Sequence, residues 1–395
     1  MGSGVPPRVV ASGNAAAPLQ ALDVVDRVVE RYRLNMLNAP HGIPARGGVI
    51  HETSFVGPGM RRSAALAYVP SRLSMVPALW RTALPPDLVV LQTSSPRHGK
   101  VSLGIEVNVL PAALEQVRAR GGLVIAQVNP QMPYTLGDGE LDVDLVDLAF
   151  EVDQPLPTHA PAVLDDSAKV IGEHVSALVP DGATLQTGIG AVPDAALAGL
   201  SERRGLRIWS EMFSDGVLAL ERGGVLDRTV PLTASFLLGS PELYDWVTGN
   251  ERVRLRRTEV TNDPTAIADQ PGMTSINTAL QVDLFGQVNA SRIGDRIHSG
   301  FGGATDFLVG ALHAPGGQAL VALRSWHPRA DVSAVVALLD QPATSFQPSA
   351  VITEHGVAPV WGRHEREQAQ GLIELAAHPR VRDELREEAH YLGLL

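Results

Sequence analysis

Hydrophobic positions along the chain fall into short apolar runs and longer amphipathic stretches. The runs at 87–93 and 123–129 are apolar without alternation and are flanked by breakers, which is typical of strands covered on both faces of a parallel sheet. Between them, 111–120 has the apolar spacing of a helix. This strand–helix–strand order indicates an α/β fold with open, mainly parallel sheets.

The same two kinds of segment continue on both sides. A helix with one apolar face is expected at 18–32. The proline-rich segment 153–161 is typical of a linker, and beyond it the strand-and-helix pattern starts again near residue 184. We therefore predict two α/β domains, residues 1–180 and 181–395.

One segment in the second half places a carboxylate on a predicted strand. Within 252–260, Val253, Leu255 and Glu259 share one parity, and strand residues of one parity face the same side. The strand should end before Pro264, which has no N–H to donate. A carboxylate at the mouth of a buried strand is either the ion-pair partner of an arginine or a reactive group, and spacing alone leaves both open.

Three loops at predicted strand ends carry residues that could bind a ligand. His98 lies in the polar loop 94–100, where open α/β sheets bind ligands, although a loop histidine without a role is an equal alternative. The turn 188–190 has the pattern Gly-x-Gly, which also serves steric needs alone. The glycine-rich segment 299–307 enters a helix, and free backbone N–H groups at a helix start form an anion site.

Composition narrows the class of protein. Of the 395 residues, 45% are hydrophobic and 19% are charged, as in a soluble globular protein. The net charge of -11 argues against a nucleic-acid partner, and the absence of cysteine excludes disulfides, thiolate catalysis and zinc–thiolate sites. Neither a leader sequence nor an apolar run of bilayer length is found, so we expect a cytoplasmic protein without a membrane partner.

Eight motifs then follow one another along nearly the whole chain, at 53–58, 127–133, 188–194, 211–216, 276–280, 286–290, 302–307 and 353–358. In this order they resemble the acetyl-CoA hydrolase/transferase family, which includes acetate-, butyrate-, succinate- and 4-hydroxybutyrate-type CoA-transferases. The resemblance implies two similar open α/β CoA-transferase domains with the active site in the cleft between them.

The resemblance also implies a ping-pong mechanism in which a glutamate becomes a glutamyl-CoA thioester. Glu259 has the matching context, and the amides of Gly302 and Gly303 would stabilise each oxyanion. The residues implied for substrate and CoA binding are Gly188, Ile189, Gly190, Asn289, Phe301, Asp306, Glu354, His355 and Gly356. Coenzyme A is expected as substrate and covalent intermediate, with no metal, and the family implies a homodimer or a dimer of dimers.

Several positions depart from the pattern of this family. Trp209 stands where histidine is common, Val309 where arginine is common and His355 where tyrosine is common, while Trp326 lies in a segment that replaces a serine-threonine segment. Three functions therefore stay open: a CoA-transferase acting between an acyl-CoA and a short carboxylic acid, an acyl-CoA hydrolase using the same glutamate, and a catalytically silent CoA-binding subunit. Nothing in the sequence identifies the acids.

Overall fold

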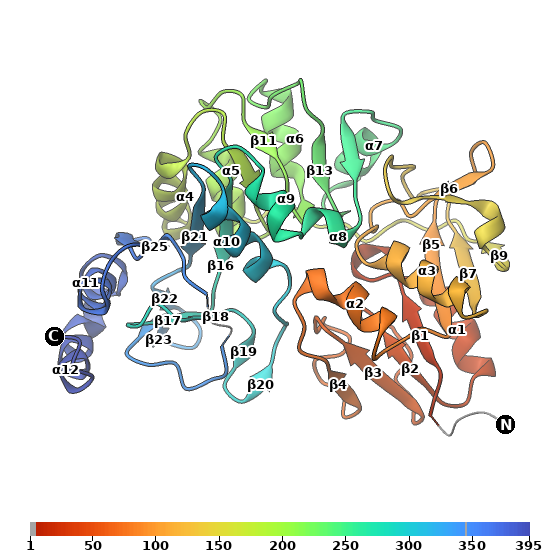
Figure 1. Ribbon diagram of the computed structural model, residues 1–395, viewed down its shortest axis with the longest axis horizontal. Coiled ribbons are helices and arrows are strands. Elements are labelled where there is room, and N and C mark those ends of the chain that lie inside the picture. Colours follow the sequence, from red (N-terminus) through yellow and green to blue (C-terminus); the bar gives the residue numbers. More distant parts are fainter. Residues whose placement is uncertain (1–4, 344–345) are drawn as a thin grey trace. The chain divides into compact units, whose positions relative to one another are not determined.

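The computed structural model describes residues 5–343 and 346–395, which form two compact units (Figure 1). Residues 1–4, which belong to the N-terminal segment considered above for a leader sequence, lie outside the described residues. The first unit comprises Met1–Ala160, Pro231–Thr261 and Ile297–Gly302, and the second comprises Pro161–Val230, Asn262–Arg296 and Gly303–Leu395. Because the chain passes between the units several times, they do not coincide with a single division at residue 180.

The first unit is built on a seven-stranded sheet in which all neighbouring strands pair in parallel. In spatial order the strands are β4 (Leu66–Tyr68), β3 (Val49–Thr53), β2 (Tyr32–Asn35), β1 (Arg8–Ala11), β5 (Leu88–Thr93), β7 (Leu123–Val128) and β9 (Leu148–Glu151). The helices that accompany it are α1 (Leu19–Val28), α2 (Val76–Arg81) and α3 (Leu110–Ala119). The predicted β–α–β unit is confirmed as β5, α3 and β7.

Burial explains the continuous apolar runs of these strands. Val89, Val90 and Leu91 of β5 are completely buried, because parallel strands in the middle of such a sheet are covered on both faces. The remaining elements of the first unit's segments are β6 (Lys100–Ser102), β8 (Glu140–Asp142), β13 (Leu232–Ala234), β14 (Phe236–Leu237), α7 (Pro241–Val247), β15 (Val253–Leu255) and α8 (Thr258–Thr261).

The second unit contains a six-stranded sheet that is parallel except at one edge, where β26 runs antiparallel to β25. In spatial order its strands are β11 (Arg207–Ile208), β10 (Thr184–Gln186), β16 (Thr274–Thr278), β21 (Gln318–Ala322), β25 (Ala350–Thr353) and β26 (Gly356–Pro359). Its helices are α4 (Asp166–Leu178), α5 (Ala191–Ala198), α6 (Asp215–Arg222), α9 (Pro264–Ala268), α10 (Ala304–His313), α11 (Glu365–Gly371) and α12 (Arg382–Tyr391).

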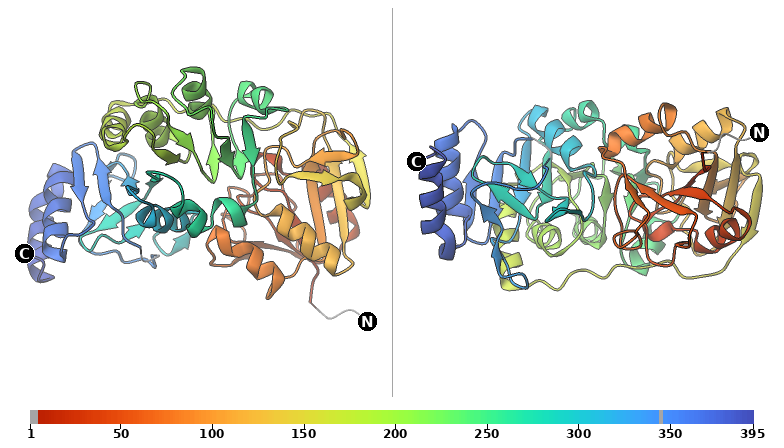
Figure 2. Two further views of the ribbon diagram at one scale, coloured as in Figure 1. Left: turned by 45° about the horizontal axis from the view of Figure 1, so that its top comes forward. Right: turned by 90° about the horizontal axis from the view of Figure 1, so that it is seen from below.

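Short strands and a π-helical segment complete this unit. The segment Leu372–Ala376 joins α11 to α12 as a π-helix, and Figure 2 shows this blue C-terminal region beside the strands it covers. Its buried side chains pack with Ala358 and Val360 of the β26 region in one hydrophobic core. The short strands are β12 (Met212–Phe213), β17 (Gln281–Asp283), β18 (Val288–Asn289), β19 (Arg292–Ile293), β22 (Trp326–His327), β23 (Val332–Ser333) and β24 (Val335–Val336). Across the described ranges, no helix is long and apolar enough to cross a membrane.

The predicted helix at 18–32 ends early, at Val28. The guanidinium of Arg46 donates hydrogen bonds to the carbonyls of Asp26 (2.8 Å), Val29 (2.7 Å) and Glu30 (2.7 Å). These bonds satisfy carbonyls at the C-terminus of α1 that have no partner within the helix, so the helix ends there and the chain continues into β2.

The predicted strand at 252–260 is also shorter than its apolar pattern indicates, because β15 ends at Leu255. The Asp138 carboxylate there accepts hydrogen bonds from Nε of Arg256 (2.9 Å) and from the backbone N–H of Arg257 (3.0 Å). The chain then turns into α8, which carries Glu259. The expectation that strand parity directs Glu259 inward with Val253 and Leu255 is therefore wrong.

Candidate functional site

The second unit has a pocket at the carboxyl ends of three neighbouring parallel strands. Residues that follow β10, β16 and β21 line it, together with the first turn of α5, and its volume is about 290 Å³. Open α/β sheets bind ligands at this position. The residues that line the pocket are Ile189, Gly190, Ala191, Val192, Pro193, Thr278, Ala279, Leu280, Ala322, Leu323, Arg324, Trp326, His327 and Ala334. We call this the strand-end pocket.

The predicted Gly-x-Gly turn borders this pocket. Gly190 has a φ of +113°, a conformation that favours glycine, and it is the N-terminal cap residue of α5. Gly188 has no such φ, and a Cβ placed on it would meet nothing within 4 Å. Neither conformation nor packing requires glycine at position 188, so its backbone is open to close approach by a ligand.

A carboxylate that was not singled out from the sequence, that of Glu211, lies in the same unit. The amide Nδ2 of Asn262 donates a hydrogen bond to its Oε2 at 3.0 Å, and the backbone N–H of Gly303 also donates to the carboxylate. Asn262 is completely buried. A Cβ on Gly303 would lie only 1.8 Å from Oε2, so this close approach requires glycine.

The ionisation of Glu211 is tuned by its surroundings. Burial raises the pKa of Glu211 from 4.5 to about 7; the hydrogen bonds from Asn262 and Gly303 oppose this rise, and the negative charge of Asp306 adds to it. The predicted ligand Asp306 is itself completely buried in the first turn of α10. Asp306 therefore acts on the site through its charge on Glu211.

Hydrogen bonds connect Glu211 to the strand-end pocket. Met212, the next residue, pairs with Thr187, from which the Gly188–Gly190 turn begins. The Ser210 hydroxyl accepts a bond from the Thr187 N–H (3.3 Å) and donates one to its carbonyl (3.1 Å). The backbone that carries Glu211 is thus fixed against the backbone that forms one side of the pocket.

Two further predicted residues lie behind another side of the pocket. Glu354 and His355 form the turn between β25 and β26, where Gly356 has a φ of +150°. The Glu354 carboxylate accepts hydrogen bonds from the N–H (2.9 Å) and hydroxyl (2.5 Å) of Ser325, which precedes the pocket residue Trp326.

The His355 ring is half-buried in an aromatic group. It lies 5.3 Å from the ring of His378, which in turn lies 5.0 Å from the ring of Trp326. Burial lowers the pKa of His355, and the neighbouring His378 and Arg382 lower it further, against the effect of Glu354. His355 is therefore mostly neutral at pH 7.

The predicted nucleophile Glu259 has a different environment, in the first unit. Its Oε1 accepts a hydrogen bond from Nη2 of Arg257 at 2.8 Å, and Arg257 also forms a two-point pair with Glu115 at 2.6 and 3.0 Å. The hydrogen bonding of the Arg257 guanidinium to the Glu115 carboxylate, which accepts, is the main cause that raises the pKa of Arg257. Glu259 thus has the ion pair that the sequence left open as the alternative to a reactive role.

One of its oxygens nevertheless has no partner. Oε2 of Glu259 is buried and accepts no hydrogen bond within the described part of the chain. A buried carboxylate oxygen without a donor is costly, so this observation keeps Glu259 as a second candidate.

The other predicted residues serve the local backbone. The amide of Asn289 bonds to the backbone of Ser291 and Arg292, which occupies both its oxygen and its nitrogen. Gly302, with a φ of +56°, has a carbonyl that accepts from the Leu73 N–H at 2.9 Å. Phe301 beside it is half-buried, and its environment assigns it no ligand.

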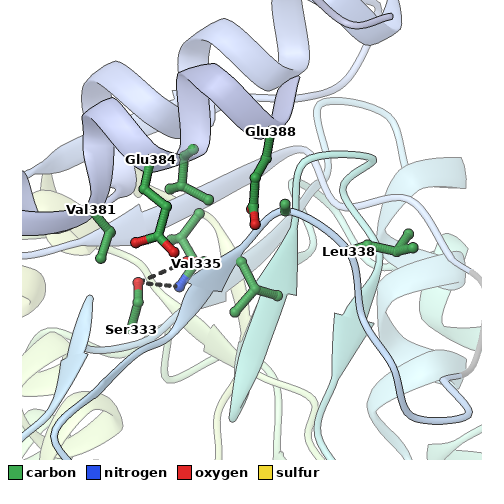
Figure 3. A pocket seen from close by; sticks show the side chains of 9 residues that line it. Ser333, Val335, Leu338, Val381, Glu384 and Glu388 are labelled. Atoms are coloured by element: carbon green, nitrogen blue, oxygen red, sulfur yellow. Dashed lines mark hydrogen bonds between the residues drawn. The ribbon is translucent and has the colours of Figure 1, made fainter. Parts of the chain in front are cut away.

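The second unit has another hollow, which lies between α12 and the strand β24 (Figure 3). Glu384 and Glu388 project from α12 over a floor that includes Val335. Two carboxylates one helical turn apart would repel the phosphates of coenzyme A. No predicted site residue lines this hollow, and among the residues that the structure covers no group of three or more metal-binding side chains is found.

Sequence reasoning missed Glu211 although it stands in one of the eight motifs, at 211–216. The motif alone gave no reason to prefer it over Glu259. The burial of Asn262 and the approach of Gly303 to the carboxylate depend on tertiary packing, which no local pattern reveals.

Comparisons with known proteins identify the family to which the chain belongs. The N-terminal domain of acetyl-CoA hydrolase/transferase matches residues 47–165, and the C-terminal domain matches residues 239–389. The 4-hydroxybutyrate coenzyme A transferase of Clostridium kluyveri is 38% identical over 354 residues, which are 86% of this chain and 81% of that protein. An acetyl-CoA hydrolase of Kluyveromyces lactis is 30% identical over 53% of this chain and 42% of its own length.

Two solved structures are similar over almost the whole chain. RipA from Yersinia pestis has a TM-score of 0.92 at 26% identity, covering 100% of this chain and 96% of that one. A 4-hydroxybutyrate CoA-transferase from Porphyromonas gingivalis has a TM-score of 0.83 at 30% identity, covering 98% and 94%. With both family domains matched and these similarities over most of its length, the chain belongs to the acetyl-CoA hydrolase/transferase family.

Proposed function

We propose that this protein is a CoA-transferase that moves CoA from an acyl-CoA to a short carboxylic acid, with Glu211 as the nucleophile. The observation that carries the proposal is the Glu211 carboxylate, which accepts hydrogen bonds from Asn262 and Gly303 and whose neighbour Met212 pairs with Thr187 at the start of the Gly188–Gly190 turn. The matched family domains support the reaction class.

The first half-reaction makes an anhydride. The oxygen of Glu211 that Asn262 does not hold, Oε1, attacks the thioester carbonyl of the acyl-CoA, and the C–S bond breaks to release CoA thiolate. The thiolate then attacks Cδ of the resulting acyl-glutamyl anhydride and expels the first carboxylate. The product is a Glu211–CoA thioester, and the incoming acid reverses both steps.

The donors on Oε2 have a role in the thiolate step. When the thiolate adds to Cδ, the negative charge of the tetrahedral intermediate develops on Oε2. Nδ2 of Asn262, at 3.0 Å, and the Gly303 N–H are already directed at this carboxylate. Preorganised donors of this kind contribute about 100- to 1,000-fold each.

Glu259 stays the rival nucleophile. Its ion pair with Arg257 favours a structural role, and its unpartnered Oε2 favours a reactive one. The hydrolase alternative is kept because an acetyl-CoA hydrolase is among the relatives. In that case water would cleave the same glutamyl thioester, and turnover would not depend on an added acid.

Intact-protein mass after incubation with acetyl-CoA and other short acyl-CoAs, without an acceptor acid, tests the proposal. We expect a mass gain of one CoA minus one water, which is the change on forming the thioester. Hydroxylamine should remove this gain, Glu211→Gln should lose it and Glu259→Gln should retain it. The exposed Glu173→Gln serves as the matched control. The opposite pattern in the two variants would assign the reaction to Glu259, and no gain with any acyl-CoA would refute the covalent mechanism.

Steady-state turnover then separates the two activities. A transferase requires an added carboxylate such as acetate or butyrate, whereas a hydrolase releases CoA without one. An assembly of two or four copies stays a prediction from the family, and sedimentation velocity of the full chain measures it.

A further inference from the structure

We propose that the strand-end pocket holds the acyl group and selects uncharged, apolar acyl groups larger than acetyl, with Trp326 as the wall that their far end contacts. This inference rests on the proposed function, because it assigns the acyl group of that reaction to the strand-end pocket. In a ping-pong transferase the acyl group of the donor and that of the acceptor acid occupy the same place, so one pocket sets both preferences.

The chemistry of the walls is mostly apolar. Beside Trp326, the side chains of nine residues are hydrocarbon: Ile189, Ala191, Val192, Pro193, Ala279, Leu280, Ala322, Leu323 and Ala334. Apolar walls favour an apolar ligand in proportion to the surface that both remove from water. An acyl group with a second carboxylate would have to leave water without an equivalent gain.

The pocket offers little to compensate a second carboxylate. Arg324 is the one arginine or lysine among its lining residues, and its guanidinium pairs with Asp165, the N-terminal cap of α4. The ring nitrogen Nδ1 of His327 accepts a hydrogen bond from the Ala330 N–H at 3.0 Å. The charge of Arg324 is thus already balanced, which disfavours succinyl and similar dicarboxylic groups.

Trp326 is held firmly in place. Its Nε1–H donates to Asp331 at 3.1 Å across the β22–β23 hairpin, and the Arg380 guanidinium lies 5.6 Å from its ring centroid. The bonds from Ser325 to Glu354 fix the preceding residue. A wall held from several sides can discriminate by shape, because it does not move to accept a different ligand.

The volume of the strand-end pocket indicates the size of the acyl group that it can hold. The pocket measures about 290 Å³, and an apolar cavity of about 150 Å³ is enough to hold benzene. A branched or cyclic acyl group therefore fits, whereas acetyl would leave most of the wall without contacts and lose their dispersion energy.

The test compares kcat/KM for acetyl-, butyryl-, cyclohexanecarbonyl- and succinyl-CoA with a fixed acceptor acid. For the wild type we expect at least about tenfold preference for the butyryl and cyclohexanecarbonyl substrates over the other two, the range that a few buried methylenes give. Trp326→Ala should reduce this preference about tenfold, because the larger acyl groups lose their contact with the indole ring. Trp326→Phe should retain part of the preference.

Trp361→Ala is the matched control, because Trp361 is 57% exposed and does not line the pocket. Equal losses for all four substrates in Trp326→Ala would overturn the inference and place the CoA arm in the pocket instead. A wild-type preference for succinyl-CoA would overturn it as well. Thermal melting shows whether each variant is folded.

Failure of the proposed function is recognised separately. If no acyl-CoA labels the wild type, calorimetric titration with cyclohexanecarboxylate and with succinate still tests the pocket. Binding of the first acid that Trp326→Ala weakens would support the apolar pocket without a transferase. The apolar pocket would be refuted if succinate alone bound, or if the wild type and Trp326→Ala bound cyclohexanecarboxylate equally.

Discussion

The pH dependence of the reaction should depend on Asn262. Glu211 attacks only as the carboxylate, so kcat/KM should rise with pH through the pKa of Glu211, which burial raises from 4.5 to about 7. Asn262 donates a hydrogen bond to the ionised form at 3.0 Å and is completely buried. Its replacement by alanine removes a hydrogen bond that stabilises the ionised form of Glu211 more than the protonated form, so the pKa of Glu211 should rise.

The size of the effect follows from that bond. A buried hydrogen bond to a charged group contributes about 1.5–3 kcal/mol, and about 1.4 kcal/mol corresponds to one pH unit. Asn262→Ala should therefore move the midpoint of the pH–rate profile upward by about one to two units. Asp306→Asn should move it downward, because the negative charge of Asp306 raises the pKa of Glu211.

The assay is the second-order rate constant for formation of the CoA adduct between pH 5 and 10, measured with subsaturating acyl-CoA because this regime reports the pKa of the free enzyme. Asp263→Asn is the control, because Asp263 adjoins Asn262 but caps α9 through the Thr265 N–H at 2.9 Å, and asparagine caps equally well. If Asn262→Ala is folded and its midpoint stays at the wild-type value, Glu211 is not the group that titrates. The assignment of the nucleophile would then be wrong.

Three other substitutions probe the site and the fold. Gly303→Ala would place a Cβ 1.8 Å from Oε2 of Glu211, so we expect adduct formation to fall at least about 100-fold; a smaller loss in a folded variant would contradict the geometry. Gly188→Ala meets nothing within 4 Å, so its melting temperature should stay unchanged while KM for acyl-CoA rises about tenfold. An unchanged KM would remove Gly188 from the ligand site. Glu52→Gln should lower the free energy of unfolding, measured in urea, by about 3 kcal/mol. The reason is that the buried Arg8, whose Nε lies 2.6 Å from Oε1 of Glu52, loses its counter-charge. Burial, the largest single influence, raises the pKa of Glu52, but the hydrogen bonds from Arg8 and Asn35 and the charges of Arg8 and Arg33 together hold it below 4.5. This stability should therefore be complete above pH 4.5 and fall as the pH drops below it; a loss under about 1 kcal/mol would refute the role of this pair.

The sequence predicted those parts of the fold that depend on burial alone. The continuous apolar runs form β5 and β7, and the amphipathic segment between them forms α3. A strand buried on both faces needs apolar residues at every position, so its local sequence is enough to predict it. The elements that ended early were stopped by single distant side chains. Arg46 ends α1 and Asp138 ends β15, and both act from outside the segment whose pattern was analysed.

The same limit applies to the site. The Gly-x-Gly turn was found because a strand–glycine–helix order is local, and it lines the strand-end pocket as a ligand loop would. Glu259 drew attention through a strand parity that Asp138 interrupts, and its role as nucleophile was predicted from its match to the family context. Glu211 was passed over because its partners, Asn262 and Gly303, lie 51 and 92 residues further along the chain (262 − 211 and 303 − 211).

The arrangement around Glu211 combines two opposing requirements of covalent catalysis by a carboxylate. A desolvated carboxylate is a stronger nucleophile than one in water, but desolvation also raises its pKa and reduces the ionised fraction at neutral pH. A pKa of about 7 leaves about half of Glu211 ionised at pH 7. The hydrogen bonds from Asn262 and Gly303 limit the rise in pKa, and Asn262 continues to donate to Oε2 as that oxygen becomes an oxyanion. The charge of Asp306, which raises the pKa, also disfavours a second negative charge on the free enzyme, so the anhydride and thioester forms of Glu211, which are neutral, gain relative to the carboxylate.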